Sequence, residues 1–272
     1  MHVELSNVTK VYEDPPEKVT ALKDISFHVN EGEFLCIVGP SGCGKSTLLR
    51  MIAGLDRPSS GQIRFKGDLL TAPHSKISMV FQSFALLPWR TVVQNVEFGL
   101  EIQGKPRNER EEISMRLLEM VGLRGSEHLY PKQLSGGMKQ RVGIARALAI
   151  NPEVVLMDEA FSAIDEFTAG ALRSEVADIH RETGKTFLLV THNIPEAIEL
   201  ADRILVLSSR PARVKSIVGV DLERPRESTD SEFITIHKDI FGLLQSELEN
   251  SMMRHRLSEL QEFKKLRDME DR

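Results

Sequence analysis

Short runs of mostly apolar residues recur along this chain, and each ends at a polar residue or a glycine-containing turn. These runs cover residues 34–38, 79–81, 154–157, 186–190 and 204–207. An apolar run of four or five residues without polar alternation is typical of a strand that is buried on both faces. The pattern therefore predicts a sheet of buried strands.

The stretches between these runs have the composition of helices, most clearly over 91–150 and over a helix predicted at about 166–182. Within 108–121, apolar residues recur at helical spacing, and Gly122 follows as a helix stop. Those residues are Ile113, Leu117, Met120 and Val121. Strands that alternate with helices predict the α/β class, with a parallel sheet covered by helices on both faces.

The two ends of the chain differ from this middle part. The first seventy or so residues alternate in short β-like pieces, broken by turn signals at 14–16, 30–32 and 58–61. After residue 226 the composition becomes rich in charge, and residues 227–272 predict one or two amphipathic helices. Their apolar positions are Ile236, Ile240, Leu243, Leu244, Leu257, Leu260, Phe263 and Leu266. Such a tail is either an appendage packed on the main domain or a dimer or regulatory contact.

Composition narrows the functional classes. The chain has 272 residues, 41% hydrophobic and 28% charged, as in soluble globular proteins. A net charge of -5 argues against a nucleic-acid partner. Two cysteines, Cys36 and Cys43, make no disulfide framework, which favours a reduced, cytoplasmic protein. No signal peptide and no membrane span is predicted, so a membrane role would depend on a partner.

The strongest chemical signal follows the first apolar run. Residues 39–47 complete the pattern G-x-x-x-x-G-K-[ST], between a predicted strand and a predicted helix. Such a loop binds phosphate groups through its backbone N–H groups and the N-terminus of the following helix. The predicted nucleotide-binding residues here are Gly39, Ser41, Gly42, Cys43, Gly44, Lys45, Ser46 and Thr47. Lys45 can reach the β- and γ-phosphates of ATP, and the Ser46 hydroxyl can ligate Mg²⁺.

Polar side chains follow three other predicted strands. Asp158 is placed to hold Mg²⁺, and Glu159 to polarise an attacking water. His192 can donate to a γ-phosphate oxygen, or it is a structural histidine. Gln82 can ligate Mg²⁺ or orient water, or it is a surface glutamine at a strand end. Because ligands of parallel sheets collect at the carboxyl ends of the strands, we expect these groups to share one site with the phosphate loop.

A second glycine-rich segment identifies the family. Residues 134–140, Leu-Ser-Gly-Gly-Met-Lys-Gln, resemble the signature of ATP-binding-cassette (ABC) ATPases. Ser135, Gly136 and Gly137 at a helix N-terminus form a second anion-binding surface. The resemblance implies a head-to-tail dimer, in which this signature closes on the ATP of the other subunit.

The resemblance covers about residues 1–225 and gives roles to weaker signals. It implies that Tyr12 stacks on adenine, that Gln82 and His192 belong to the catalytic site, and that Asp165, in the segment 162–165, lies at the dimer seam. The chain departs from the family at Ala160, where proline is usual, and at Ile164, where leucine is usual. Ala160 puts the turnover rate in doubt but not nucleotide binding.

The implied fold is a P-loop NTPase with a RecA-like parallel sheet core, an antiparallel β subdomain, a helical subdomain and a C-terminal helical extension. The implied domains are a nucleotide-binding domain at 1–225, with its helical subdomain at about 85–150, and an extension at 226–272. The implied cofactors are ATP and Mg²⁺.

Residues 81–92 and 208–214 look like the nitrate, sulfonate, taurine and bicarbonate importer ATPases. This narrower resemblance implies an ATPase subunit on the inner face of the cell membrane, bound to permease subunits and to a second ATPase subunit. A periplasmic or lipoprotein substrate-binding protein would deliver the small anion. Trp89, the only tryptophan, would face the permease, or else it packs in the core. The alternatives are an ATPase subunit of a lipid or peptide exporter, and a soluble ABC ATPase outside transport.

Overall fold

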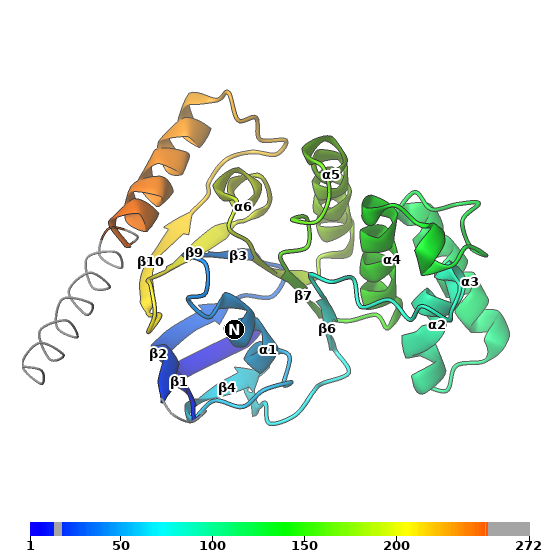
Figure 1. Cartoon of the computed structure of the whole chain (residues 1–272), viewed down its shortest axis with the longest axis horizontal. Helices are drawn as coiled ribbons and strands as arrows, with labels where there is room; N and C mark the ends of the chain where they lie inside the picture. Colours follow the sequence, from blue (N-terminus) through cyan, green and yellow to red (C-terminus); the bar gives the residue numbers. More distant parts are fainter. Residues whose placement is uncertain (14–17, 248, 250–272) are drawn as a thin grey trace, which may run out of the picture.

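The computed structural model describes residues 1–13, 18–247 and 249. A six-stranded sheet in the order β10-β9-β3-β8-β7-β6 forms its centre (Figure 1). β3, β6, β7, β8 and β9 run parallel, and β10 pairs antiparallel with β9 at one edge. The strands are β3 (Phe34–Val38), β6 (Ile77–Val80), β7 (Val154–Asp158), β8 (Thr186–Val190), β9 (Arg203–Leu207) and β10 (Val214–Gly219). The predicted parallel sheet is thus confirmed.

The N-terminal β pieces form a second, antiparallel sheet in the order β2-β1-β4-β5. Its strands are β1 (Val3–Tyr12), β2 (Val19–Val29), β4 (Ser60–Phe65) and β5 (Asp68–Leu69). The turn predicted at 14–16 lies outside the described residues.

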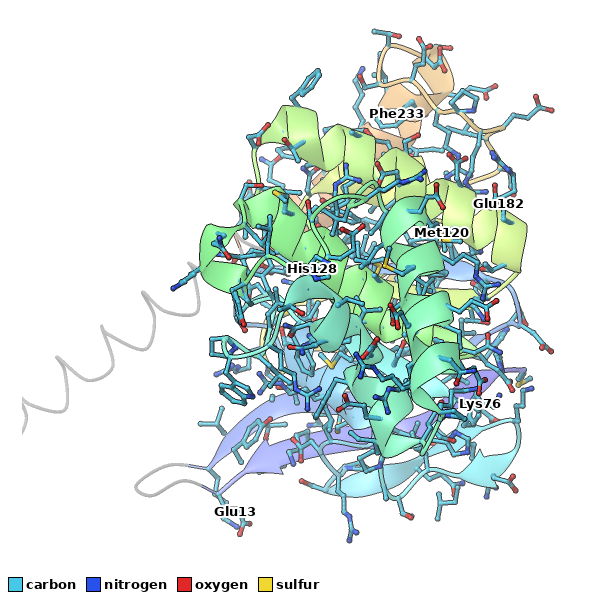
Figure 2. All side chains as sticks on the ribbon, turned by 90° about the vertical axis from the view of Figure 1, so that its right-hand side faces the viewer. Glu13, Lys76, Met120, His128, Glu182 and Phe233 are labelled. Carbon is cyan, nitrogen blue, oxygen red and sulfur yellow. The ribbon has the colours of Figure 1, made fainter. Side chains whose placement is uncertain are left out.

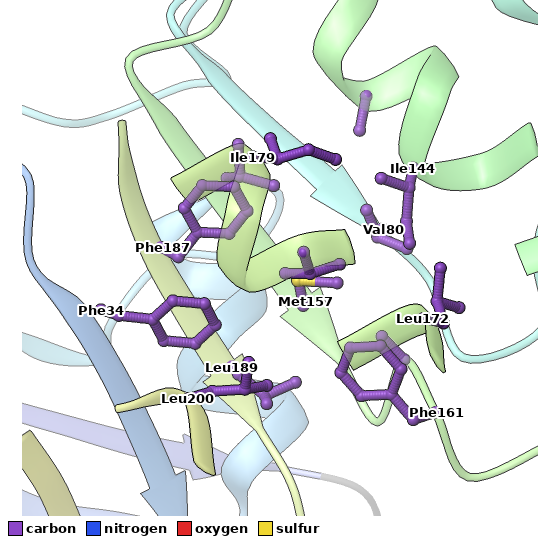
Figure 3. Packing of buried hydrophobic residues seen from close by; sticks show 14 of the residues in the cluster. Phe34, Val80, Ile144, Met157, Phe161, Leu172, Ile179, Phe187, Leu189 and Leu200 are labelled. Carbon is purple, nitrogen blue, oxygen red and sulfur yellow. The ribbon is translucent and has the colours of Figure 1, made fainter. Parts of the chain in front are cut away.

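Both faces of the central sheet are buried, which explains its unbroken apolar runs. On β3, Phe34 and Cys36 point into one hydrophobic cluster, whereas Leu35 and Ile37 point into another. The first cluster lies under the helices on the outer face, where Phe34 stacks on Phe187 with ring centroids 5.3 Å apart (Figure 3). The second fills the space between the two sheets. Successive side chains of a strand point to opposite faces, so both alternate positions of these runs are buried and nearly all are apolar. The buried Thr186 is an exception, and its hydroxyl is hydrogen-bonded to His2 Nδ1 and Gly32 N–H.

Helices cover the central sheet on both faces. α1 (Lys45–Ile52) packs in the second cluster, between the two sheets, whereas α5 (Glu166–Thr183) and α6 (Ile194–Leu200) pack on the opposite face (Figure 1). The helix predicted at about 166–182 is therefore confirmed as α5.

The helical part beyond β6 contains α2 (Val92–Ile102), α3 (Arg107–Met120), the short 3₁₀ helix η1 (Pro131–Gln133) and α4 (Gly136–Ala149). The predicted helical region at 91–150 is thus confirmed. α3 ends one residue before the predicted Val121, and Gly122 follows with φ 66°. Leu117 and Val121 are buried, but Met120 is 39% exposed and lies on the outer surface of α3 (Figure 2). The helical spacing of apolar residues thus marks the helix, although not each of these residues is covered.

Residues 231–247 form a helix that packs beside β10 and α6 (Figure 1). Phe233 and Ile240 on this helix are buried in the same cluster as Phe34. Its first apolar positions therefore pack on the main domain, as an appended helix would. The later apolar positions, Leu257, Leu260, Phe263 and Leu266, lie outside the described residues.

Candidate functional site

The phosphate loop runs from the end of β3 to the start of α1. Gly42 and Gly44 have φ values of 72° and 118°, which favour glycine, and Gly44 is the N-cap of α1. Lys45 is buried, and its ammonium donates hydrogen bonds to the carbonyl oxygens of Gly39 (2.8 Å) and Pro40 (3.1 Å). The loop thus curls around the lysine head group, as an anion-binding loop does.

Cys43 lies inside this loop and is 1% exposed. Burial raises the pKa of its thiol, although the positive charge of Lys45 opposes this shift. Both cysteines of the chain are free thiols, as predicted.

Ser46 and Asp158 meet at the carboxyl edge of the sheet. The Ser46 hydroxyl donates to Asp158 Oδ1 at 2.9 Å. Burial raises the pKa of Asp158, the Ser46 hydrogen bond opposes this rise, and the charge of Glu159 adds to it. A hydroxyl and a carboxylate side by side are oxygen ligands of the kind that Mg²⁺ takes, so these residues fit that ion.

Glu159 lies at the centre of a cluster with Gln82 and His192, the two residues for which the sequence allowed either a functional or a structural role. Gln82 Nε2 donates to Glu159 Oε2 at 2.9 Å, and His192 Nδ1 lies 3.5 Å from Glu159 Oε1. These three residues follow β6, β7 and β8, which are neighbours in the sheet. Gln82 and His192 therefore sit beside the carboxylate, and not at isolated strand ends.

The backbone of Glu159 is in the left-handed region, with φ 46°. A non-glycine residue in this region stores strain, which is found most often at functional sites. The turn is held because Glu159 N–H donates to Val190 O (2.9 Å), and because Ser162 N–H and its hydroxyl donate to Glu159 O. Ala160 is buried. Hydrogen bonds therefore hold the turn at both ends, even though residue 160 is alanine and not proline.

The signature segment lies at the start of α4, away from the phosphate loop. The Ser135 hydroxyl caps this helix by accepting from Met138 N–H at 3.3 Å. In Figure 1, β6 and β7 separate α4 from α1. Ser135 and Lys45 thus belong to different regions of the protomer.

Gly136 and Gly137 pack against residues 163–168 of the same chain. A Cβ on Gly136 would lie 3.2 Å from Ala163 O, and one on Gly137 would lie 2.7 Å from Thr168 Cγ2. Asp165 is the N-cap of α5, where its Oδ1 accepts from Thr168 N–H at 3.0 Å. The signature and the Asp165 segment therefore form one contact, which their separation in sequence did not indicate.

Tyr12 lies beside the phosphate loop, with its hydroxyl 3.2 Å from Thr47 Oγ1 and 3.3 Å from Asp56 Oδ2. Lys10 holds this side chain: its ammonium bonds Asp56 Oδ1 at 2.5 Å and lies 5.0 Å from the centre of the Tyr12 ring. The sequence analysis missed Lys10 and Asp56. Tyr12 was found through the resemblance, and no local motif marks the two residues that orient it.

Trp89 is 71% exposed, so the alternative that it packs in the core is wrong. It lies in the loop before α2. Asn95 on α2 is fully buried and holds this loop through Leu87 N–H, which donates to its Oδ1 at 2.8 Å. The Asn95 amide donates in turn to Leu87 O, Arg90 O and Thr91 O. These hydrogen bonds hold the loop in a conformation that leaves Trp89 exposed.

Among residues 1–13, 18–247 and 249, no helix combines the length and the apolar character that crossing a membrane requires.

Comparison with known proteins agrees with this arrangement. Residues 22–162 match the protein family described as ABC transporter. An uncharacterized ABC transporter ATP-binding protein of Methanocaldococcus jannaschii is 49% identical over 250 residues, which are 92% of this chain and 94% of that protein. The nitrate import ATP-binding protein NrtD of Synechocystis is 44% identical, over 90% of this chain and 96% of that protein. Other relatives, 43–44% identical, are named as taurine, aliphatic sulfonate and bicarbonate transport ATP-binding proteins.

Among solved structures, a dimeric ATP-binding cassette in a post-hydrolysis state, bound to ADP and Pi, is 35% identical. It matches with a TM-score of 0.73 and covers 81% of this chain and 100% of that chain. The resemblance to ABC ATPases and the predicted P-loop NTPase fold are both confirmed. The chain, with its phosphate loop, acidic strand end and signature segment, belongs to the ABC transporter family as one of its ATP-binding proteins.

Proposed function

We propose that this chain is the ATP-hydrolysing subunit of an ABC importer for a small anion of the nitrate, sulfonate, taurine or bicarbonate class. The names of its relatives support this class of cargo. The observation that carries the enzymatic part is the convergence of Gln82 and His192 on Glu159, beside the phosphate loop. The alternatives, an exporter subunit and a soluble ABC ATPase, are not favoured, because these relatives are named as import or transport proteins.

In this proposal the phosphate loop binds the β- and γ-phosphates of ATP through its N–H groups and Lys45. Ser46 and Asp158, together with Gln82, would hold Mg²⁺, and the ion would supply positive charge against the phosphate oxygens. Tyr12 stacks on the adenine. The ring is held at the edge of the loop by its contacts with Thr47 and Asp56.

Glu159 accepts a proton from the attacking water, and Gln82 orients that carboxylate through the hydrogen bond at Oε2. His192 holds the γ-phosphate. Its Nδ1 lies 3.5 Å from Glu159 Oε1, so one imidazole can contact both the base and the γ-phosphoryl group. In-line attack then yields ADP and phosphate.

The complete site forms between two subunits. Ser135, Gly136 and Gly137 of one subunit bind the ATP that is held by the phosphate loop of the other, and Asp165 lies at the seam. The separation of α4 from α1 within the protomer supports this arrangement, as does the dimeric state of the related cassette. The second ATPase subunit is either a copy of this chain or a sister ATPase.

The membrane permease binds near Trp89. A cavity of about 760 Å³ lies next to this loop and is lined by charged residues of both signs, among them Arg90, Glu97 and Arg110. The exposed Trp89 ring can pack against an apolar side chain of a partner, and the charged lining of the cavity can pair with polar groups of the same partner segment. The subunit therefore sits on the inner face of the cell membrane, and a substrate-binding protein delivers the anion outside.

The substitution Glu159→Gln tests the enzymatic part. Because the carboxylate acts on water and not on nucleotide, we expect kcat to fall by about 10²–10⁴-fold while the Kd for ATP changes less than about threefold. Hydrolysis by the purified dimer and binding of a fluorescent ATP analogue measure the two quantities. Glu182→Gln, the same change at the exposed end of α5, is the control. Wild-type turnover in the Glu159 variant would contradict the role of this residue.

The cargo is tested by uptake in a strain that lacks this chain, with nitrate, taurine, alkanesulfonates and bicarbonate compared. We expect loss of uptake for one of these anions and recovery with the wild-type chain but not with Glu159→Gln. Unchanged uptake of all four, with loss of lipid or peptide export, would favour the exporter alternative.

A further inference from the structure

The loop between β9 and β10, residues 208–213, is part of the narrower resemblance but has no role in the proposed mechanism. It is tied to the antiparallel sheet, because Ala212 N–H donates to Ala21 O (2.9 Å) and Lys23 N–H donates to Ala212 O (2.9 Å). Ser208 N–H donates to Arg213 O at 3.0 Å and closes the loop. The end of β9 also touches the phosphate loop, since a Cβ on Gly39 would lie 3.1 Å from Leu207 Cβ.

Arg210 in this loop reaches the phosphate loop directly. Its Nη2 donates to the carbonyl oxygen of Gly42 at 2.8 Å. In a trans peptide the C=O and the following N–H point in opposite directions, so this bond directs the Cys43 N–H away from Arg210. That N–H donates to Pro40 O at 3.3 Å, the same oxygen that accepts from Lys45. Arg210 thus holds the plane of a peptide inside the phosphate loop, one hydrogen bond away from the oxygen that also holds the Lys45 ammonium.

The C-terminal helix holds the residue before Arg210. Glu247 Oε2 accepts from Ser209 N–H at 3.0 Å and from the Ser209 hydroxyl at 3.1 Å, and both bonds are buried. Glu247 is 8% exposed and pairs with Lys215 Nζ at 2.8 Å. Lys215 also donates to Leu243 O and to the Ser246 hydroxyl, which joins the end of the helix to β10.

We propose that Arg210 is a positioning residue of the phosphate loop, and that the helix of residues 231–247 keeps it in place through Glu247 and Ser209. The chain of contacts runs from the buried Glu247 carboxylate to Ser209, from Ser209 to its neighbour Arg210, and from Arg210 to Gly42. The helix after the nucleotide-binding domain is therefore a part of the nucleotide site. This inference rests on ATP binding at the phosphate loop, as in the proposed function.

The test compares Arg210→Ala with Arg213→Ala, a matched change in the same loop. Arg213 faces Asp24 at 4.0 Å, and among the described residues it makes no hydrogen bond or ion pair with the phosphate loop. We expect Arg210→Ala to raise the Kd and the KM for ATP about three- to tenfold, with kcat within about twofold, because Glu159 and His192 are untouched. Arg213→Ala stays within about twofold in all three quantities, and Arg210→Lys restores part of the affinity.

A double-mutant cycle tests the helix. Glu247→Ala raises the Kd for ATP in the wild-type background but adds nothing in the Arg210→Ala background, because both changes break one chain of contacts. Ser209→Ala removes only the hydrogen bond from the Ser209 hydroxyl to Glu247. Its effect on the Kd for ATP is compared in the wild-type and Arg210→Ala backgrounds in the same way, with less disturbance of packing. A thermal melt of each variant separates loss of affinity from loss of folding.

Equal Kd values for Arg210→Ala and Arg213→Ala would overturn the role of Arg210. An equal effect of Glu247→Ala or Ser209→Ala in both backgrounds would overturn the role of the helix. Failure of the wild-type protein to bind ATP would instead reject the proposed function, and that binding is measured first.

Discussion

Glu196 on α6 is a buried carboxyl that the proposed mechanism does not use. It is 4% exposed, and its Oε1 has no hydrogen-bond partner among the described residues. Burial raises its pKa to about 7; Thr191 and Arg173 oppose this rise, whereas the charges of Glu199 and Glu166 add to it. The carboxyl lies close to Thr191, the neighbour of His192, so its ionisation changes the charge near the end of β8.

The ionisation of Glu196 makes stability depend on pH. In the unfolded chain this group ionises near 4.5, whereas in the folded protein it keeps its proton to about pH 7. The folded state binds the extra proton, so the free energy of unfolding falls as pH rises from about 4.5 to 7, by about 3 kcal/mol. Gln at this position does not titrate.

We therefore expect the Tm of Glu196→Gln, relative to wild type, to rise between pH 5 and pH 8. Thermal melts across this range measure the difference. Glu182→Gln, which changes an exposed carboxyl, is expected to show a nearly constant difference. A Tm difference for Glu196→Gln that does not vary with pH would rule out the raised pKa.

At the scale of elements, Asn95 joins α2 to the loop that carries Trp89. One side chain there satisfies a backbone N–H and three carbonyls of the loop. We expect Asn95→Ala to lower the free energy of unfolding by about 2–3 kcal/mol, because it leaves buried backbone groups unpaired. The anisotropy of Trp89 fluorescence should fall as the loop loosens. Asn108→Ala, an exposed change on α3, is the control, and equal anisotropy in the two variants would contradict the role of Asn95.

The strands of the central sheet were the most predictable elements, because burial on both faces favours an apolar residue at nearly every position. α3 was harder. Its spacing predicted a helix but not which apolar positions are covered: Leu117 and Val121 are buried and Met120 is exposed, because coverage depends on which neighbouring helix reaches each position. The turn at Glu159 was also predictable in place but not in its strained conformation, which the contacts with Val190 and Ser162 impose.

At the scale of the whole molecule, the helix of residues 231–247 packs on the core to which β3 contributes. Phe233 is 2% exposed in the cluster that contains Phe34, 199 residues earlier in the sequence (233 − 34 = 199). We expect Phe233→Ala to lower the free energy of unfolding by about 3–4 kcal/mol through loss of burial and the cavity left behind. Phe241 on the same helix is 52% exposed, so Phe241→Ala should change it by about 0.5 kcal/mol. Urea unfolding followed by circular dichroism measures both, and equal losses would show that the helix is not part of the core.

The candidate site was predicted residue by residue where a motif or a strand end marked it, as for Lys45, Ser46 and Asp158. The contacts that tie distant segments to it could not be predicted in this way. Arg210 and Glu247 are ordinary charged residues in the sequence, and their relation to Gly42 follows from the path of the chain around the sheet. Their place in the nucleotide site remains a proposal.

The packing of Gly136 and Gly137 against residues 163–168 has a mechanical consequence. The backbone oxygen of Glu159 accepts hydrogen bonds from Ser162, and a few residues later the chain packs on the two glycines, where a Cβ on Gly137 would clash with the Thr168 side chain. We therefore expect a bulkier residue at position 137 to displace residues 163–168 and, through Ser162, to disturb the turn that carries Glu159 as well as the start of α4.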